Sequence, residues 1–408
     1  MINVSALQPS GSDSLASRYL VVLVTVLFAV FVVMFPRYTD ASKTPFALLC
    51  LFALIYLLLN PRQLLSTANL VRAWFAVIIL EFTWIAISYY ANGAPERGHG
   101  FVWDRHFYML FLIPMFLLFR RVQISDRVLI ILLTVSSALA LGDIAVDLVR
   151  GLDHRAQGMN PNKLGPIQLC ISGILLFYAL KMPASTLRKL AFTGFLIAFA
   201  TVVLSQSKTT LVVMAMISLP ILAYFTRHLS LPKKLLSLLA LVVGLISIYN
   251  LPLIQGRFDK AATNVSNYFG CDDQDDCERL GTFGTRAELW KGAWQIFLDS
   301  PVIGAGVGSF PAQLEQNWQR YEIPEIVAAH GFKYAHNQYL AALATRGFPG
   351  LLLFLLLLAF PVYIAMSCKS DDVSTNVARF SVYLISAVLA IGSLGEDYFE
   401  GKPVNVVN

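Results

Sequence analysis

His336 is the side chain best placed for proton transfer in this sequence. It ends a long polar stretch and begins the run His336-Asn337-Gln338-Tyr339-Leu340, where the chain becomes apolar again. An imidazole exchanges its proton near neutral pH, so a histidine at this boundary can act as a general base. We therefore predict a catalytic role for His336 and a polar substrate contact for Gln338, although a lone histidine is more often structural.

Five basic residues form a second candidate set, because arginine and lysine are the usual protein partners of phosphate oxygens. They are Arg155, Lys163, Lys208, Arg257 and Arg286. Arg155 lies in a short polar turn that also supplies the amides of Asn160 and Asn162, and Lys208 is surrounded by serines and threonines. We predict that the set binds a diphosphate, with the two asparagines as further polar contacts. The competing interpretation is that each basic side chain reaches lipid headgroups.

The composition requires a membrane around these residues. Of 408 residues, 57% are hydrophobic and 14% are charged, and the mean hydropathy of +0.64 lies far above that of soluble proteins. A helix needs about 20 mostly apolar residues to cross the hydrocarbon core. Eleven segments fit: 18–35, 44–60, 70–90, 103–119, 127–149, 163–182, 188–204, 209–226, 235–253, 349–367 and 377–394. A twelfth, 336–346, is apolar but short, so we predict an all-α polytopic membrane protein of about 12 transmembrane helices.

Lysine and arginine are distributed unevenly between the loops of the two sides, which predicts the orientation. The richer loops read as cytoplasmic, so the large loop after the ninth span faces outward. We accordingly divide the chain into a cytoplasmic tail (1–17), spans one to nine (18–253), an outward insertion (254–335), spans ten to twelve (336–395) and a C-terminal tail (396–408).

Two cysteines in the insertion, Cys271 and Cys277, flank an acidic run at residues 272–276. We predict a disulfide between them, which requires an oxidising compartment and agrees with an outward-facing loop. The acidic run could instead hold a divalent cation, since hard cations take oxygen ligands. We favour the disulfide because no further ligand pattern accompanies the run, and we expect neither a metal nor a cofactor.

An amphipathic helix and a glycine-rich turn follow in the insertion. Thr285-Arg286-Ala287-Glu288 has the spacing of a capping box, and apolar residues recur at helical intervals until Pro301. We expect this helix to lie on the membrane surface. Glycines alternate with other residues at 304–308, but their spacing differs from that of a dinucleotide-binding turn. A turn that lets backbone segments approach closely is the simpler interpretation.

Acidic residues inside the spans leave a transporter interpretation open, because charges in hydrocarbon are unfavourable and often mark ion paths. Glu81 lies midway along the third span, and Asp143 and Asp147 lie near the outward end of the fifth. Transport is the weaker interpretation, since Glu81 is nearly alone and no inverted repeat is evident.

Together these motifs make the chain similar to the O-antigen ligase and polymerase superfamily of membrane glycosyltransferases. The matching pieces are the turn from Arg155 to Asn162, the turn Ser207-Lys208-Thr209, the segment around Arg286 with Pro301 and the glycine run, and His336-Asn337-Gln338 followed by Gly347. Relatives often have Ser-Arg where this chain has Ser207-Lys208, which puts a bidentate phosphate contact there in doubt.

The resemblance implies a helical bundle of about twelve spans in the bacterial inner membrane, with both termini cytoplasmic and the site facing the periplasm. Its members transfer a glycan from undecaprenyl diphosphate, and for the ligases the acceptor is the lipid A-core oligosaccharide. The family's essential histidine corresponds to His336 and its loop arginine to Arg286. We expect a metal-independent, inverting transfer, with His336 as general base and the cations stabilising the departing diphosphate. Membrane lipid is a further expected partner, and nucleic acid is not.

Two other activities of the superfamily fit the same motifs. A polymerase joins two lipid-linked glycans, and a protein O-glycosylating oligosaccharyltransferase uses a protein acceptor. We favour the ligase because the insertion is single and moderate in size, without an added soluble domain that would hold a protein substrate.

Overall fold

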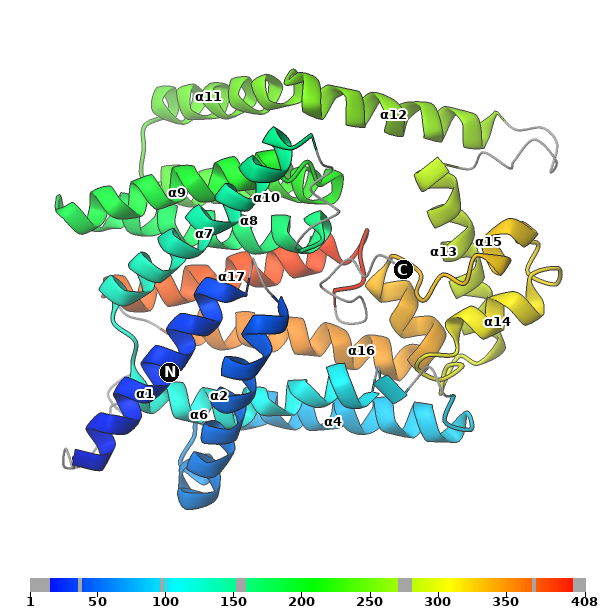
Figure 1. Ribbon diagram of the computed structural model, residues 1–408, viewed down its shortest axis with the longest axis horizontal. Coiled ribbons are helices and arrows are strands. Elements are labelled where there is room, and N and C mark those ends of the chain that lie inside the picture. Colours follow the sequence, from blue (N-terminus) through cyan, green and yellow to red (C-terminus); the bar gives the residue numbers. More distant parts are fainter. Residues whose placement is uncertain are drawn as a thin grey trace.

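The structure is a computed structural model that describes residues 15–35, 39–95, 99–100, 102–151, 159–270, 281–368 and 372–398. The regular elements within these ranges are helices (Figure 1). Nine of the described helices are long and apolar enough to cross a membrane. The predicted fold class, an all-α polytopic membrane protein, is therefore confirmed.

The membrane part before the insertion consists of long helices and one composite segment. The helices are α1 (Leu15–Met34), α2 (Thr39–Leu59), α4 (Asn69–Ala91), α7 (Asp126–Val149), α8 (Pro161–Lys181), α9 (Thr186–Leu204), α10 (Lys208–Thr226) and α11 (Leu231–Tyr249). The predicted span at 103–119 is built from a π-helical turn, η2 (Val102–His106), a 3-10 turn, η3 (Phe107–Phe111), and α6 (Leu112–Val122). The short helix α3 (Arg62–Leu65) connects α2 to α4.

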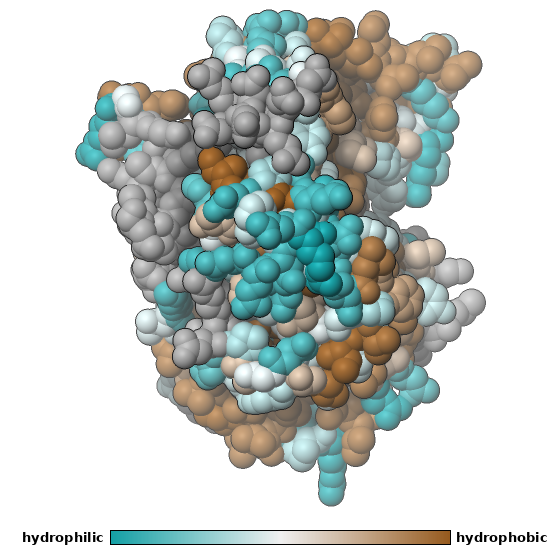
Figure 2. Space-filling model, turned by 90° about the vertical axis from the view of Figure 1, so that its right-hand side faces the viewer, coloured by the Kyte–Doolittle hydropathy of each residue, from teal (hydrophilic) through white to brown (hydrophobic). Residues whose placement is uncertain are grey.

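The insertion lies at one end of the bundle, on the right in Figure 1, which we call the site end. Its helices are α12 (Pro252–Phe269), α13 (Gly281–Asp299), α14 (Phe310–Asn317) and α15 (Glu325–Ala329). α12 continues from α11 toward this end, whereas α13 runs across the ends of the spans (Figure 1). Figure 2, which looks onto the site end, shows hydrophilic residues gathered in its centre and hydrophobic residues at its margins.

α13 begins one turn before the predicted capping box. Its first residue is Gly281, and Thr285 Oγ1 donates a hydrogen bond of 2.9 Å to the Gly281 carbonyl instead of capping the helix. Glu288 has another partner, because Tyr268 Oη donates to Glu288 Oε1 at 2.8 Å. The predicted cap is therefore wrong, although the helix itself and its end before Pro301 agree with the prediction.

The packing is densest around α8, of whose membrane window 61% is buried, compared with 0% for α11. Aromatic residues fill this core, with the rings of Phe177 and Phe380 4.8 Å apart between centroids. Gly194 lets α9 approach α7, because a Cβ there would lie 2.3 Å from Thr134 Oγ1. The candidate site residues of α8 and α10 lie in the first turns of these helices, and the hydrophobic core holds both helices in place. α11 lies at the periphery of the bundle.

The segment 336–346 is not a separate span. Residues Gln338–Ser367 form one helix, α16, which is broken at Gly347 (φ 68°, ψ −171°), and α17 (Val373–Gly392) follows. α17 returns to the site end, where the Gln338 N–H donates to the Ser393 carbonyl at 2.9 Å. With α1 and the composite segment added to the nine long helices, the described residues hold eleven segments that could cross a membrane. The described residues therefore hold an odd number of such segments, and the expectation of two cytoplasmic termini stays a prediction, because residues 1–14 and 399–408 lie outside the described residues.

Candidate active site

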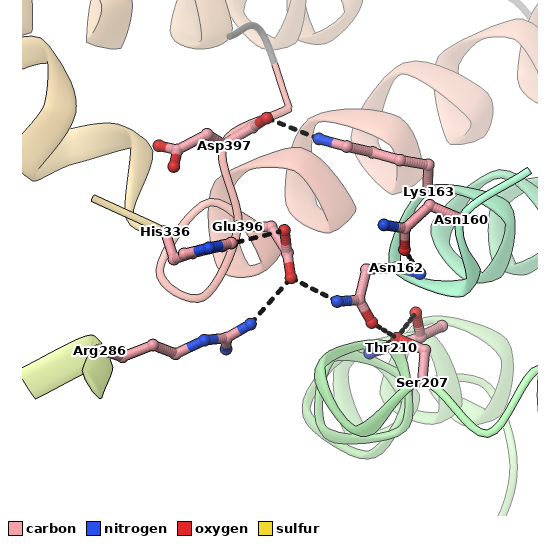
Figure 3. A network of polar contacts seen from close by, with 9 residues as sticks. All are labelled: Asn160, Asn162, Lys163, Ser207, Thr210, Arg286, His336, Glu396 and Asp397. Atoms are coloured by element: carbon pink, nitrogen blue, oxygen red, sulfur yellow. Dashed lines mark hydrogen bonds and ion pairs between the residues drawn. The ribbon is translucent and has the colours of Figure 1, made fainter. Parts of the chain in front are cut away.

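The candidate residues meet around the carboxylate of Glu396, which follows α17 (Figure 3). Arg286 Nη2 of α13 donates to Glu396 Oε1 at 3.0 Å, and Asn162 Nδ2 of α8 donates to the same oxygen at 2.5 Å. His336 Nδ1 lies 3.8 Å from Glu396 Oε2. Three residues that are distant in sequence and were singled out separately therefore share one carboxylate partner.

Asn162 extends this cluster to α10 (Figure 3). Ser207 Oγ donates to Asn162 Oδ1 at 2.8 Å, and Thr210 Oγ1 donates to Ser207 Oγ at 2.9 Å. Lys163 binds the other side of the turn, because its Nζ donates to the Asp397 carbonyl at 2.5 Å and lies 4.9 Å from the centre of the Tyr398 ring. The turn at residues 393–398 is thus held between α8 and the insertion.

Three helices begin at this cluster, and each has a side-chain cap. Asn160 caps α8, Ser207 caps α10 and Asn337 caps α16. The Asn337 carboxamide accepts from the N–H groups of both Tyr339 and Leu340, at 3.0 and 3.1 Å. Helix N-termini carry unpaired N–H groups and a partial positive charge, which favour bound anions. The backbone therefore adds positive potential to that of the basic side chains.

His336 is held in an unusual backbone conformation immediately before α16. Its φ of 54° lies in the left-handed region, which is uncommon for residues other than glycine and is often found at functional sites. The edge of the Tyr334 ring packs against the imidazole, with centroids 5.1 Å apart. On the other side, Tyr339 Oη donates to the Ala390 carbonyl at 2.6 Å, which ties the start of α16 to α17.

The Glu396 carboxylate is ionised in this surrounding. Burial raises the pKa of the Glu396 carboxyl, but its interaction with His336 and the positive charges of Arg286, His336 and Lys163 outweigh burial, so the pKa lies below its ordinary value. The side chain is 6% exposed, whereas that of His336 is 26% exposed. A buried carboxylate thus faces an imidazole that remains accessible.

Two adjoining cavities open beside this cluster. The first, of about 430 Å³, is lined by Asn160, Asn162, Lys208 and Arg286 together with apolar residues of α10 and α12. The second, of about 450 Å³, is lined by Gln206, Lys208, Arg257, Lys260 and others. Lys208, Asn264 and Thr282 line both cavities. In the second cavity Arg257 Nε donates to Gln206 Oε1 at 2.9 Å.

Most of the predicted residues are brought together, with four exceptions. His336, Arg286, Lys163, Asn160 and Asn162 lie in or next to the cluster around Glu396, and Lys208 and Arg257 line the adjoining cavities. Gln338 is fully buried, and its described hydrogen bond joins α16 to the turn after α17. Arg155, Cys271 and Cys277 lie outside the described residues.

Glu396 is the residue that sequence reasoning missed. The only signal was the polar stretch Gly395-Glu396-Asp397-Tyr398 directly after the last span, which was assigned partly to a tail. No group of three or more His, Cys, Asp or Glu side chains among the described residues is arranged to hold a metal ion, and the acidic run at 272–276 is not described.

A comparison with known families agrees with this arrangement. A family model described as O-antigen ligase matches residues 193–355, a segment that contains Lys208, Arg257, Arg286 and His336. No curated protein matches the chain. The matched segment contains the histidine and the basic residues that line both cavities, so over these residues the chain is similar to the O-antigen ligase family.

Proposed function

We propose that this protein is an O-antigen ligase, which transfers a glycan from undecaprenyl diphosphate to the lipid A-core oligosaccharide at the periplasmic face of the bacterial inner membrane. The observation that carries the proposal is the position of His336 next to Arg286 through their shared partner Glu396. Arg286 also lines the first cavity with Lys208. A base and a cationic pocket for a leaving group therefore stand side by side.

The two cavities suit a diphosphate that is attached to a polyprenyl chain. Lys208 faces both cavities, and the N-terminus of α10 begins at this residue, so an anion there is bound by a side chain and by a helix terminus. Apolar lining comes from Val212 of α10 and from Phe258 and Val265 of α12. An apolar wall next to a cationic pocket matches a lipid diphosphate better than it matches a soluble sugar nucleotide.

In the reaction that we propose, His336 Nε2 removes the proton from an acceptor hydroxyl. The hydroxyl oxygen then attacks the anomeric carbon, the bond from that carbon to the diphosphate oxygen breaks, and undecaprenyl diphosphate leaves with the bonding electrons. Arg286 and Lys208 stabilise the charge that develops on the diphosphate. A single displacement inverts the anomeric configuration, and the fixed cations do the work for which a metal would otherwise be needed.

Glu396 orients the base in this scheme. Its carboxylate lies on the Nδ1 side of the His336 ring, so a proton on Nδ1 favours the tautomer in which Nε2 is the accepting nitrogen. The same carboxylate stabilises the imidazolium that forms when Nε2 takes the acceptor proton. Its ion pair with Arg286 uses Nη2, one of two terminal nitrogens that a guanidinium offers to anions.

A compartment argument supports a lipid-linked donor. Nucleotide sugars and ATP are absent outside the cytoplasmic membrane, so glycosyl transfer there needs a donor that is already activated and delivered on a lipid. A polyprenyl-diphosphate glycan meets this requirement, and it reaches the cavities laterally from the membrane.

The experiment is transfer by the purified protein in liposomes that contain undecaprenyl-diphosphate glycan and lipid A-core acceptor. We expect wild type to form the linked product without added metal, and His336→Ala to form none while remaining folded. His330→Ala is the matched control, because His330 is exposed on the same insertion and stacks only on Phe332 among the described ring contacts. Normal transfer by His336→Ala would refute the proposed base, and product that joins two lipid-linked glycans would identify a polymerase.

A further inference from the structure

The break in α16 lies inside the apolar part of the molecule and must be stabilised there. A helix that ends leaves its last carbonyl groups without intrahelical partners, and such groups are unfavourable in surroundings that exclude water. The first part of α16, residues 338–346, ends at Gly347 and begins directly after the proposed base, His336. We call residues 338–346 the half-helix.

Backbone N–H groups of the insertion satisfy part of this need. Ala305 N–H donates to the Ala344 carbonyl at 2.9 Å, and Gly306 N–H donates to the Thr345 carbonyl at 3.0 Å. The close approach depends on glycine, because a Cβ on Gly304 would lie 2.3 Å from the Arg346 nitrogen. The predicted role of the glycine run, close backbone approach, therefore has a specific partner, which is the end of the half-helix.

One face of α4 supplies the remaining donors. Trp84 Nε1 donates to the Arg346 carbonyl at 2.7 Å, and Ser88 Oγ donates to the Thr345 carbonyl at 2.6 Å. Asn92 Nδ2 donates to the Gly304 carbonyl at 3.1 Å. Spacings of three and four residues place these side chains on one face of the helix.

The same face of α4 carries Glu81, which forms a buried ion pair across the break. Arg346 Nη1 donates to Glu81 Oε1 at 2.5 Å, and each side chain is 1% exposed. An unpaired charge at such a place is strongly unfavourable, so each residue keeps the other in position. An arginine is permanently charged, which suits a fixed pair better than a carboxylate that exchanges protons along an ion path. The pair removes the main support for a transporter.

We propose that Glu81, Trp84, Ser88 and Asn92, which we call the α4 anchor, act with Arg346 as positioning residues for the proposed base. They hold the far end of the half-helix, while the Gln338–Ser393 hydrogen bond holds its near end. At about 1.5 Å per residue, the half-helix is a rigid connection of about 13 Å between the anchor and His336. A tilt of this connection moves the imidazole relative to Glu396. The inference rests on the proposed role of His336.

The test replaces the ion pair by neutral residues of similar size. Glu81→Gln combined with Arg346→Met removes both charges of the pair, so neither partner is left as a buried charge without the other. We expect the protein to fold but to lose the fixed link between α4 and the half-helix. We expect kcat to fall about 10- to 100-fold, since a displacement of about 1 Å in a reacting group has effects of this order. KM for the lipid-linked donor should change less than threefold, because Lys208 and Arg286 belong to other helices.

A second readout follows the half-helix directly. Amide hydrogen exchange of residues 338–346 should become at least tenfold faster in the double variant, whereas α17 keeps its exchange rate. Ser88→Ala, which removes one hydrogen bond and no charge, should show the same changes at about a third of the size. The control is Asp126→Asn at the opposite end of the bundle, which removes the negative charge and one of the two oxygens that accept from Tyr178 and Ser374, and it should leave kcat unchanged.

The outcomes separate the two proposals. Wild-type kcat in the folded double variant overturns the anchor, as does a lower kcat with unchanged exchange of the half-helix. If exchange becomes faster but His336→Ala is fully active, the half-helix is anchored as described and the proposed base is wrong.

Discussion

Replacing Glu396 by glutamine tests the centre of the candidate site with the smallest change in shape. The amide keeps the size of the side chain and one accepting oxygen, but it replaces the other oxygen by an NH2 donor and removes the negative charge. Glu396 pairs with His336, the proposed base, and with Arg286, which is proposed to bind the diphosphate. The substitution therefore removes the negative charge next to both residues at once.

The magnitude follows from the 3.8 Å between His336 Nδ1 and Glu396 Oε2. Two unit charges about 4 Å apart attract each other by about 4 kcal/mol at an effective dielectric constant of about 20. The His336 side chain is 26% exposed, so solvent screens part of this attraction, and we take about half, or about 2 kcal/mol. Each 1.36 kcal/mol is a factor of ten in rate, so kcat should fall about 30-fold, with about 1,000-fold as the upper bound.

The assay compares kcat and KM for donor and acceptor in liposomes, together with thermal unfolding of the same preparations. Most of the effect of Glu396→Gln should appear in kcat, because the imidazolium that the carboxylate stabilises exists only as the hydroxyl is deprotonated. Glu322→Gln is the control, since Glu322 is an exposed carboxylate of the insertion that pairs with Lys291. It should leave both constants within twofold of wild type.

Two results would refute this reasoning. A folded Glu396→Gln protein with unchanged kcat would show that the carboxylate does not assist the base. A loss confined to KM for the donor would show that Glu396 acts through Arg286 on diphosphate binding instead of through His336.

Three further predictions concern neighbouring features. Since the pKa of Glu396 is lowered, its ionised form stabilises the folded protein above about pH 4.5, and this contribution is lost as the pH falls through the lowered pKa. Acid should therefore lower the melting temperature of wild type more steeply than that of the Glu396→Gln variant. Lys208→Ala should raise KM for the donor about 10- to 100-fold, the effect of losing a charged hydrogen bond, and Lys208→Arg should restore most of it in the same kinetic assay. Gly347→Ala should lower the free energy of unfolding by about 1–3 kcal/mol, because φ is 68° and the new Cβ would lie 2.2 Å from the Val302 carbonyl oxygen. Gly244→Ala on α11 is the control, because no atom lies within 4 Å of the new Cβ, and it should not lower the free energy of unfolding in parallel melting curves.

The spans were predictable because each needs only length and apolar composition, and both are local properties. The helix break was harder to place. The sequence Gly347-Phe348-Pro349-Gly350 suggests that one helix ends and another begins, yet only Gly347 leaves helical geometry. Pro349 lies in the first turn after the break, where a proline lacks no needed N–H group and is well tolerated. α16 continues beyond the break because it contacts α4 and the insertion at this point, and the number of possible crossings is odd as a result. A local sequence pattern contains no information on such contacts.

The candidate site was predictable in its parts and not in its centre. His336, Arg286, Lys208 and Asn162 were found because each lies in a polar turn next to an apolar segment. Glu396 lies after the last span in a turn without a recognisable motif, and its importance arises only when α8, α13 and α16 meet. The predicted cap at Thr285 is wrong for a related reason: contacts with α12 extend α13 backwards by one turn, so the spacing of a cap occurs inside the helix.

The balance of charge at the site indicates which substrate the cations serve. Around the first cavity and its rim, Lys163, Lys208 and Arg286 and three helix N-termini contribute positive potential, and the carboxylates of Glu396 and Asp397 compensate part of it. Like charges held together are unfavourable unless an anion joins them, so the site gains electrostatic energy when a multiply charged group enters. An acceptor hydroxyl is neutral and cannot supply this gain, whereas a diphosphate can. In the proposed reaction the diphosphate of the donor is therefore the group that these cations bind, and Glu396 balances part of their charge between Arg286 and His336.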